Sequence, residues 1–338
     1  MKSIRHGVSG LLLATCFAAT LAGAQSHSSF DKSSGGAGQA YPTKPIRLLV
    51  PFPPGAGADV VARLLAQKLT DGLGVQVIVD NRGGAGGTLG AAIASRAAPD
   101  GYTLMMGSVA SLGTAQGLFK DLPYNPLNDF TPVTLAARSP SGFLTALNLP
   151  AKSVKEVIAL AKAQPGKLNY SSSGGGSPSH LGMELFKNMA GVSMVHVPYR
   201  GPAEALNALV MNEAQVEVQS MLSATPFVQS GRIRLLAMTG VKRMAEYPDV
   251  PTVAEAAVPG YSVYTWFGVV APAGVPKPVL DRLHGATVHA LGTTEMRKQF
   301  ANQGAEVVAN TPAEFSAFLR EEVVKWNKVI RDSGARAE

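Results

Sequence analysis

The sequence holds a loop of proline and glycine whose backbone amides suit an anion. Residues 51–59 read PFPPGAGAD. Three prolines stiffen this loop, while Gly55 and Gly57 let backbone N–H groups come close to a guest. A helix start with free amides is a ready anion site, and Asp59 is expected to be the N-cap of the helix that follows. The alternative interpretation is an ordinary strand-to-helix turn of an α/β protein.

A second loop repeats this design later in the chain. Residues 172–181 read SSGGGSPSHL, and the hydroxyls of Ser172, Ser173 and Ser177 add hydrogen-bond donors to the glycine amides. Pro178 fits the first turn of a following helix. A few charge-assisted hydrogen bonds of about 1.5–3 kcal/mol each would support micromolar binding, about 8 kcal/mol.

The elements around the first loop predict a parallel sheet. Apolar residues 46–50 predict a buried strand before the loop, and residues 59–69 an amphipathic helix after it. Strands at 75–79 and 102–106 follow, with a helix through 92–97 between them, which is a strand–helix–strand pattern. Ligands bind beyond the carboxyl ends of such strands. Ser108 ends the third strand at that edge, as a donor or as a plain turn serine.

The rest of the chain predicts a second α/β unit and a return to the first. The expected strands are 143–147, 168–171, 194–197, 216–218, 235–238 and 265–270, and the expected helices are 154–164, about 178–189, 203–210, 279–291 and 296–303. Thr311 and Glu314 form a capping box that starts a helix reaching about residue 330. Two units that offer glycine-rich loops to one side predict a cleft between them.

The N-terminus has the pattern of an export signal. Lys2 and Arg5 precede the apolar residues 8–21, and Ala22-Gly23-Ala24 predicts cleavage after Ala24. The only cysteine, Cys16, lies inside this segment, so lipidation would need cleavage before it. The mature chain then has no thiol chemistry. Residues 25–41 are rich in Ser and Gly and predict a flexible lead-in.

Composition and charge indicate a globular protein and argue against a nucleic-acid-binding one. The chain has 338 residues with 46% apolar and 16% charged residues, which is typical of a globular protein. Without Lys2 and Arg5 there are 28 basic and 23 acidic residues, a net charge of +5. The basic residues are scattered, so no nucleic-acid partner is expected. A mildly positive field suits an anionic small molecule.

Nucleotide-binding and enzyme motifs are missing. The glycine loop at 83–87 has Leu89 where a dinucleotide fingerprint needs glycine, and no P-loop is present. Its glycines are interpreted as allowing close helix–strand packing. The chain lacks a Gly-x-Ser-x-Gly elbow, and His284 and His289 lack the spacing of a zinc site. We therefore expect no enzyme, catalytic residue, metal or cofactor. The rival classes are an exported enzyme and a protein-interaction module.

Several motifs together resemble the Bug family, the extracytoplasmic solute receptors of tripartite tricarboxylate transporters. The likeness covers nearly all of the chain after Ala40. The segments that carry it are 41–59, NRGGAGGTLG at 81–90, APDGYTL at 98–104, 173–181, VPYRG at 197–201, PDVPT at 248–252, WFG at 266–268 and APAG at 271–274.

The resemblance implies an α/β, two-lobed periplasmic binding protein of Venus-flytrap, type II-like architecture, with its ligand cleft between the lobes. It implies domain 1 at 42–142 plus 264–310, domain 2 at 143–263, and a C-terminal helix at 311–338 across them. The implied ligand is a small carboxylate (a di- or tricarboxylate or an aromatic acid), with a neutral amide bound by an orphan receptor as the alternative. The implied partner is a membrane permease, with a signalling sensor as the alternative, and a monomer is expected.

The expected binding residues follow from the two loops and the resemblance. They are Phe52, Pro54, Gly55, Ala56, Gly57, Ser108, Ser172, Ser173, Gly174, Ser177, His180, Tyr199 and Arg200. Phe52 would give an apolar wall, and Arg200 would pair with a second carboxylate or face solvent. His180 would face the cleft or hydrogen-bond to the backbone. Residues 216–231 depart from the family pattern, so the contact at the distal end of the ligand, near residues 219–221, stays open.

Overall fold

The computed structural model describes residues 41–302 and 304–336. The predicted signal peptide with its cleavage after Ala24, the lipidation alternative at Cys16 and the lead-in before residue 41 lie outside the described residues. Within residues 41–302 and 304–336, no helix is both long and apolar enough to cross a membrane.

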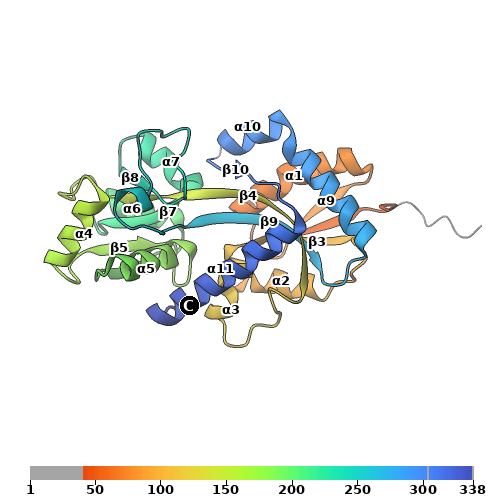
Figure 1. The fold of residues 1–338 in the computed structure, drawn as a ribbon, viewed down its shortest axis with the longest axis horizontal. Coiled ribbons are helices and arrows are strands. Elements are labelled where there is room, and N and C mark those ends of the chain that lie inside the picture. Colours follow the sequence, from red (N-terminus) through yellow and green to blue (C-terminus); the bar gives the residue numbers. More distant parts are fainter. Residues whose placement is uncertain (1–40, 303, 337–338) are drawn as a thin grey trace, which may run out of the picture. The chain divides into compact units, whose positions relative to one another are not determined.

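The described residues form one mixed sheet of ten strands (Figure 1). The strand order is β2-β1-β3-β9-β4-β7-β5-β6, and β8 and β10 pair with β4 outside this path. The strands are β1 (Ile46–Val50), β2 (Val77–Asn81), β3 (Thr103–Ser108), β4 (Phe130–Thr145), β5 (Asn169–Ser172), β6 (Val195–Pro198), β7 (Val216–Ser220), β8 (Arg234–Met238), β9 (Tyr264–Pro272) and β10 (Glu306–Val307). Strand β1 is parallel to β2 and β3, as predicted, whereas β9 is antiparallel to β3 and β4.

Strand β4 belongs to both halves of the sheet. Its residues Phe130 to Pro140 pair with β9, while Ser141 to Thr145 pair with β7 and β8. Figure 1 shows β4 and β9 running between the two halves. The fold is therefore the expected α/β, two-lobed binding-protein fold. We propose that residues 42–142 with 264–310 form the first lobe and residues 143–263 the second.

Helices cover both faces of the sheet. They are α1 (Gly57–Leu73), α2 (Thr88–Ser95), α3 (Ala115–Leu118), α4 (Val154–Ala163), α5 (Pro178–Ala190), α6 (Pro202–Val210), α7 (Met221–Gln229), α8 (Val253–Ala256), α9 (Lys277–Gly292), α10 (Thr294–Asn302) and α11 (Pro312–Ser333). A 3₁₀ turn (Ala85–Gly87) precedes α2, and a π-helical turn (Val109–Thr114) precedes α3.

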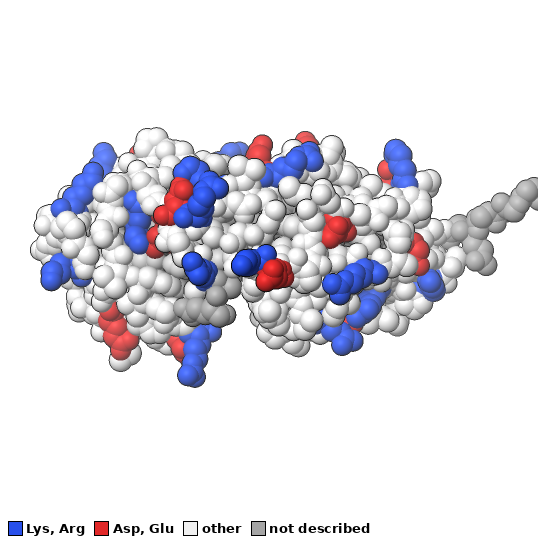
Figure 2. Space-filling model, turned by 90° about the horizontal axis from the view of Figure 1, so that it is seen from below, with Lys and Arg blue, Asp and Glu red and all other residues white. Residues whose placement is uncertain are grey.

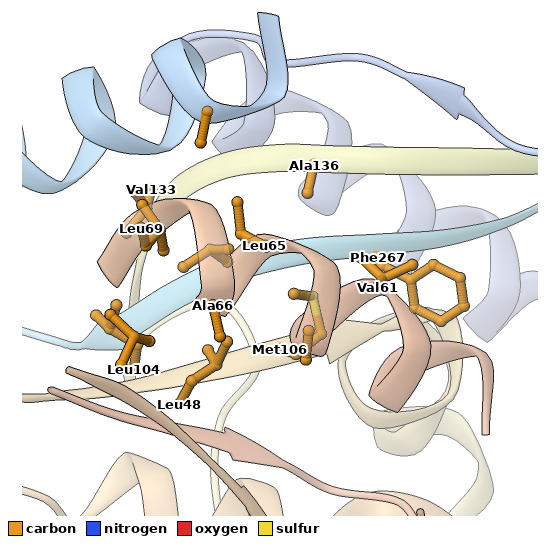
Figure 3. Packing of buried hydrophobic residues seen from close by; sticks show 14 of the residues in the cluster. Leu48, Val61, Leu65, Ala66, Leu69, Leu104, Met106, Val133, Ala136 and Phe267 are labelled. Carbon is orange, nitrogen blue, oxygen red and sulfur yellow. The ribbon is translucent and has the colours of Figure 1, made fainter. Parts of the chain in front are cut away.

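The first-lobe core lies under α1. Val61, Leu65 and Leu69 recur on one face of this helix, as expected from the sequence, and are buried. Figure 3 shows them above Leu48 of β1 and Leu104 of β3. Burying a side chain of this size contributes roughly 1.5–3 kcal/mol. This packing fixes the start of α1 at the carboxyl edge of the sheet.

Helix α11 contributes to the cores of both lobes. Phe315 and Leu319 pack in a cluster with residues of β3 and α2, while Trp326 and Ile330 pack in the cluster that contains α5 and β7. Its predicted capping box at Thr311 is present. The buried Trp266, which the sequence placed near the hinge or core, is linked to the same helix through Nε1, which donates to Glu322.

Several elements differ from the sequence-based expectations. The strand expected at 143–147 is the end of a strand that begins at Phe130, because Pro132, Pro140 and Gly142 hide its pattern. Prolines and glycines weaken a strand prediction, and irregular register near Pro132 accommodates one of them. Helices α3, α7 and α8 and the short strand β10 were not predicted at all.

Candidate functional site

The start of α1 is built around a buried carboxylate. The helix begins at Gly57 with Ala56 as its N-cap, so the prediction that Asp59 is the N-cap is wrong. Asp59 lies in the first turn, where its Oδ2 accepts the Gly55 N–H at 2.8 Å and Arg63 Nε at 3.0 Å. Its Oδ1 accepts Asn81 Nδ2 at 2.9 Å. Burial favours a higher pKa for Asp59, but these hydrogen bonds outweigh it and lower the pKa.

This arrangement leaves two amides of α1 open. Asp59 occupies the Gly55 amide, and the Ala56 amide donates to Pro53. Among the described residues, the Gly57 and Ala58 amides have no hydrogen-bond acceptor. They therefore remain to bind a ligand at the positive end of the helix. The φ of +83° at Gly55 is one that L side chains rarely adopt, so glycine is needed for this turn.

The first loop faces the second lobe. A Cβ at Gly57 would lie 3.0 Å from Phe267 Cζ and 3.7 Å from Leu222 Cδ1, and Leu222 belongs to α7. The half-buried Phe52 ring lies against the glycine loop before α2, where a Cβ at Gly87 would approach its Cζ to 2.9 Å. Pro54 is exposed on the same loop.

The glycine-rich segment before α2 packs closely on the first loop. A Cβ at Gly90 would lie 2.6 Å from the Arg82 carbonyl oxygen and 2.7 Å from the Pro51 Cα. These glycines therefore allow close helix–strand packing, which is the role expected for them.

The Ser108 side chain is used inside its own turn. Ser108 is buried, and its Oγ accepts the Ser111 N–H while Ser111 Oγ accepts the Ser108 N–H. Tyr124 Oη donates to the carbonyl of Ser111 and holds the turn from the other side. Of the two interpretations of Ser108, this geometry favours the turn serine.

In the second loop, Ser173 has a different environment from Ser172 and Ser177. Ser172 is fully buried with its Oγ 2.6 Å from His196 Nε2, and Ser177 caps α5 by accepting the His180 N–H. Ser173 Oγ accepts hydrogen bonds from Ser179 Oγ at 3.3 Å and Gln219 Nε2 at 2.8 Å. Both contacts use the oxygen as acceptor, so the Ser173 hydroxyl proton is available to a ligand.

His180 is part of a buried stack of rings. Its ring lies 3.9 Å from that of His196, which lies 4.9 Å from that of Tyr170. The Gly176 N–H donates to His180 Nδ1 at 3.0 Å, so His180 binds the backbone. Burial and then the neighbouring His196 lower the His180 pKa to about 4. The ring is therefore neutral at neutral pH and holds the loop in place.

Tyr199, Arg200 and Gly174 lie at the rim of the second loop, where they line an open surface pocket. The pocket has a volume of about 480 Å³ and is also lined by Ser173, Gly175, Pro198 and Glu204. Tyr199 Oη donates to Glu213 at 3.2 Å, and the Arg200 side chain is exposed, which agrees with its solvent-facing alternative.

Three helix starts from two lobes thus meet at one place. Gly57 of α1 approaches Leu222 of α7, and Gln219, which precedes α7, binds Ser173 of the α5 loop. The groups on offer are amide N–H and hydroxyl donors with three helix dipoles, which together suit an anion. Figure 2 shows a notch between the two halves and mixed charges over that face.

Within residues 41–302 and 304–336, no group of three or more His, Cys, Asp or Glu side chains could hold a metal ion. His284, considered in the sequence for a zinc site, lies with Nδ1 3.1 Å from the Val133 carbonyl oxygen.

Ser179 and Asn81 were not among the expected binding residues, and Gln219 lies in the stretch 219–221 whose contact was left open. Gln219 and Ser179 orient Ser173, and Asn81 ties β2 to the first loop by donating to the Phe52 carbonyl and to Asp59. Asn81 is the last residue of β2 and Gln219 the last but one of β7, and both strands pair in parallel with a neighbour. The rule that ligand groups gather at the carboxyl ends of such strands would have found them.

Comparison with known proteins agrees with this geometry. Residues 61–335 match the family model described as tripartite tricarboxylate transporter family receptor. Protein BugT of Bordetella pertussis is 36% identical over 297 residues, which cover 88% of this chain and 91% of BugT. A protein encoded in the tcbD-tcbE intergenic region of a Pseudomonas species is 34% identical over 292 residues, which cover 86% of this chain and 87% of the relative.

Solved structures with the same fold include two with bound acids. R. palustris Rpa4515 with adipate has a TM-score of 0.77 and 34% identity, covering 88% of this chain and 99% of that one. MatC of Rhodopseudomonas palustris with bound malate has a TM-score of 0.73 and 33% identity, covering 86% and 100%. The periplasmic binding protein BugD has a TM-score of 0.73 and 32% identity, covering 88% and 100%.

Proposed function

Because the chain belongs to the tripartite tricarboxylate transporter receptor family, a family of periplasmic solute receptors, we propose that it binds a small carboxylate between its lobes. Adipate and malate are the acids in two related structures. A dicarboxylate of this size is therefore the first candidate ligand. We further propose that the chain is exported, acts as a monomer and delivers its ligand to a membrane permease.

The observation that carries this proposal is the meeting of three helix starts, two of which offer free hydrogen-bond donors. The Gly57 and Ala58 amides come from the first lobe, and the Ser173 hydroxyl comes from the second. A carboxylate accepts such hydrogen bonds and is favoured by the positive ends of helix dipoles. Closure of the lobes on a bound acid would bring both sets of donors to it.

The remaining expected residues take supporting roles in this proposal. Phe52 provides an apolar wall, and Gly55 and Ala56 shape the turn that presents the Gly57 amide. Gly174 opens the rim next to Tyr199. Arg200 would meet a second carboxylate only when the rim closes over the ligand.

Thermal melting against a panel of acids tests the proposal. A ligand at about a hundred times its Kd stabilises the native state by about 2.7 kcal/mol, which raises the Tm of a chain of this size by about 5 °C. We expect such a shift with one mono-, di- or tricarboxylate, with adipate and malate tested first. Ser173→Ala should remove most of the shift.

Ser153→Ala is the matched control. Ser153 caps α4 in the second lobe, where its Oγ accepts the Glu156 N–H. Its loss should lower the Tm of the free protein while leaving the ligand-induced shift intact. Shifts with neutral amides or sugars and with no acid would overturn the carboxylate proposal, but the receptor fold would stand.

A further inference from the structure

Below Ser173, the second lobe buries a carboxyl group that the proposed binding site does not itself use. We propose that Glu217 is a positioning residue that must remain protonated for tight carboxylate binding, so that its ionisation weakens the receptor's hold on its ligand. This inference rests on the proposed function.

Glu217 connects to the site through two hydrogen bonds in sequence. Its Oε1 accepts Gln219 Nε2 at 2.9 Å, and the same Nε2 donates to Ser173 Oγ at 2.8 Å. Its Oε2 accepts Ser171 Oγ at 3.0 Å. Glu217 thereby fixes the amide of Gln219, which in turn orients the Ser173 hydroxyl toward the place where the lobes meet.

The carboxyl group has no cationic partner to hold it as an anion. Glu217 is 0% exposed, and no Lys or Arg among the described residues forms an ion pair with it. Burial therefore raises its pKa to about 8, although the Ser171 and Gln219 hydrogen bonds lower it in part. When Glu217 is protonated on Oε2, the hydrogen bond between it and Ser171 can reverse, with the acid donating its proton to Ser171 Oγ.

The ionisable groups around Glu217 lie on the strands and helices of the second lobe that surround it. The paired stretch of β4, from Ser141 to Thr145, carries no ionisable side chain. On the rim, Tyr199 bonds to Glu213, and burial followed by Glu213 raises the Tyr199 pKa above its usual 10. The other neighbouring ionisable groups are Tyr170 on β5, His196 on β6, His180 and Glu184 on α5 and the exposed Glu204 on α6.

Ionisation of Glu217 would place a negative charge close to Ser173, which receives the ligand, with only the Gln219 amide between them. Repulsion between the two carboxylates is strong there because buried groups are poorly screened. By linkage, a ligand that binds the protonated form better must raise the proton affinity of Glu217. The receptor would accordingly bind tightly at neutral pH and release its acid as the pH rises through 8.

The test is calorimetric titration of adipate and malate at pH 7 and pH 9. For the wild type we expect the Kd to rise up to about tenfold, since one unit above the pKa about a tenth of the molecules keep the proton. Glu217→Gln keeps both hydrogen bonds but cannot ionise, so its Kd should change less than about twofold. The control Glu322→Gln replaces another buried carboxylate, on α11, and should behave as the wild type.

Proton uptake gives a second measurement that needs no variant. At pH 8, titrations in two buffers of different ionisation enthalpy should show the wild type taking up as much as about half a proton with each ligand. A wild-type Kd that is the same at both pH values, zero uptake, or a Glu217→Gln response equal to that of the wild type would overturn the inference. If no carboxylate binds at pH 7, the proposed function itself fails, and this inference fails with it.

Discussion

The loops before α1 and α5 share one design but stabilise it by different chemistry. Each links the end of a parallel strand to a helix start through glycine. The α1 loop is held by the Asp59 carboxylate, which binds Gly55, Arg63 and Asn81. The α5 loop is held by hydroxyls and by the neutral His180 imidazole. The α1 loop therefore contains a negative charge, whereas the α5 loop contains none.

Because of this difference, the two loops should contribute differently to ligand affinity and to stability. A carboxylate in the first turn of α1 favours the helix, because it meets the positive end of the dipole, but it also offsets part of the attraction for an anionic ligand. The neutral α5 loop keeps its full attraction. We therefore expect the α5 loop to contribute more to ligand affinity and the α1 loop to depend more strongly on a single side chain.

The largest expected effect comes from Asp59→Ala. Loss of this side chain removes the acceptor of three donors, of which the exposed Arg63 can bind water instead, so the free energy of unfolding should fall by about 3 kcal/mol. Ser179→Ala in the α5 loop removes one neutral partner of the Ser173 amide and should cost only about 1 kcal/mol. Urea denaturation of both variants without ligand measures the difference. Equal losses would remove the contrast between the loops.

Acid should destabilise the α5 loop before the α1 loop. The unfolded chain protonates His180 near pH 6.5, but the native ring only near 4, so stability should fall as the pH drops between these values. A shift of this size corresponds to about 2 kcal/mol by pH 4.5. The lowered pKa of Asp59 keeps its contribution present above about pH 4.

Denaturation midpoints between pH 7 and 4.5 check this order. His180→Asn should be less stable at pH 7 but should lose less on acidification. The exposed His289→Gln, on α9, is the control and should follow the wild type. A His180→Asn profile parallel to the wild type would assign the acid sensitivity to other groups.

The smallest effect concerns the N-caps. Ser177 caps α5, whereas Ala56 at the start of α1 has backbone angles suited to a cap (φ −66°, ψ 156°) but no side chain to provide one. Ser177→Ala should lower stability by about 1 kcal/mol, and Ala56→Ser should raise it by up to about 1 kcal/mol. Opposite signs in thermal melts of the free protein would support the comparison; a loss in both would contradict it.

The sequence alone determined the local units of this protein. The strand at Ile46–Val50, Pro178 in the first turn of α5 and the capping box at Thr311 appear where they were predicted. Each of these patterns depends on residues within a few positions of one another, so it can be interpreted without the rest of the chain. The glycine-rich loops could be located in the same way, and the family motifs added the two-lobed fold.

Only the tertiary structure decided how these units cooperate. Strand β4 forms because β7, β8, β9 and β10 pair with it from distant parts of the chain, and those pairings override the prolines in its own sequence. Asp59 is a residue type that often caps helices, but here it accepts hydrogen bonds from the Gly55 amide and Asn81, which the turn and β2 place around it. Glu217 resembles any strand glutamate until burial without a cation favours its neutral form. Strand pairing, burial and electrostatic environment depend on residues that are far apart in the sequence, so no local sequence pattern can predict them.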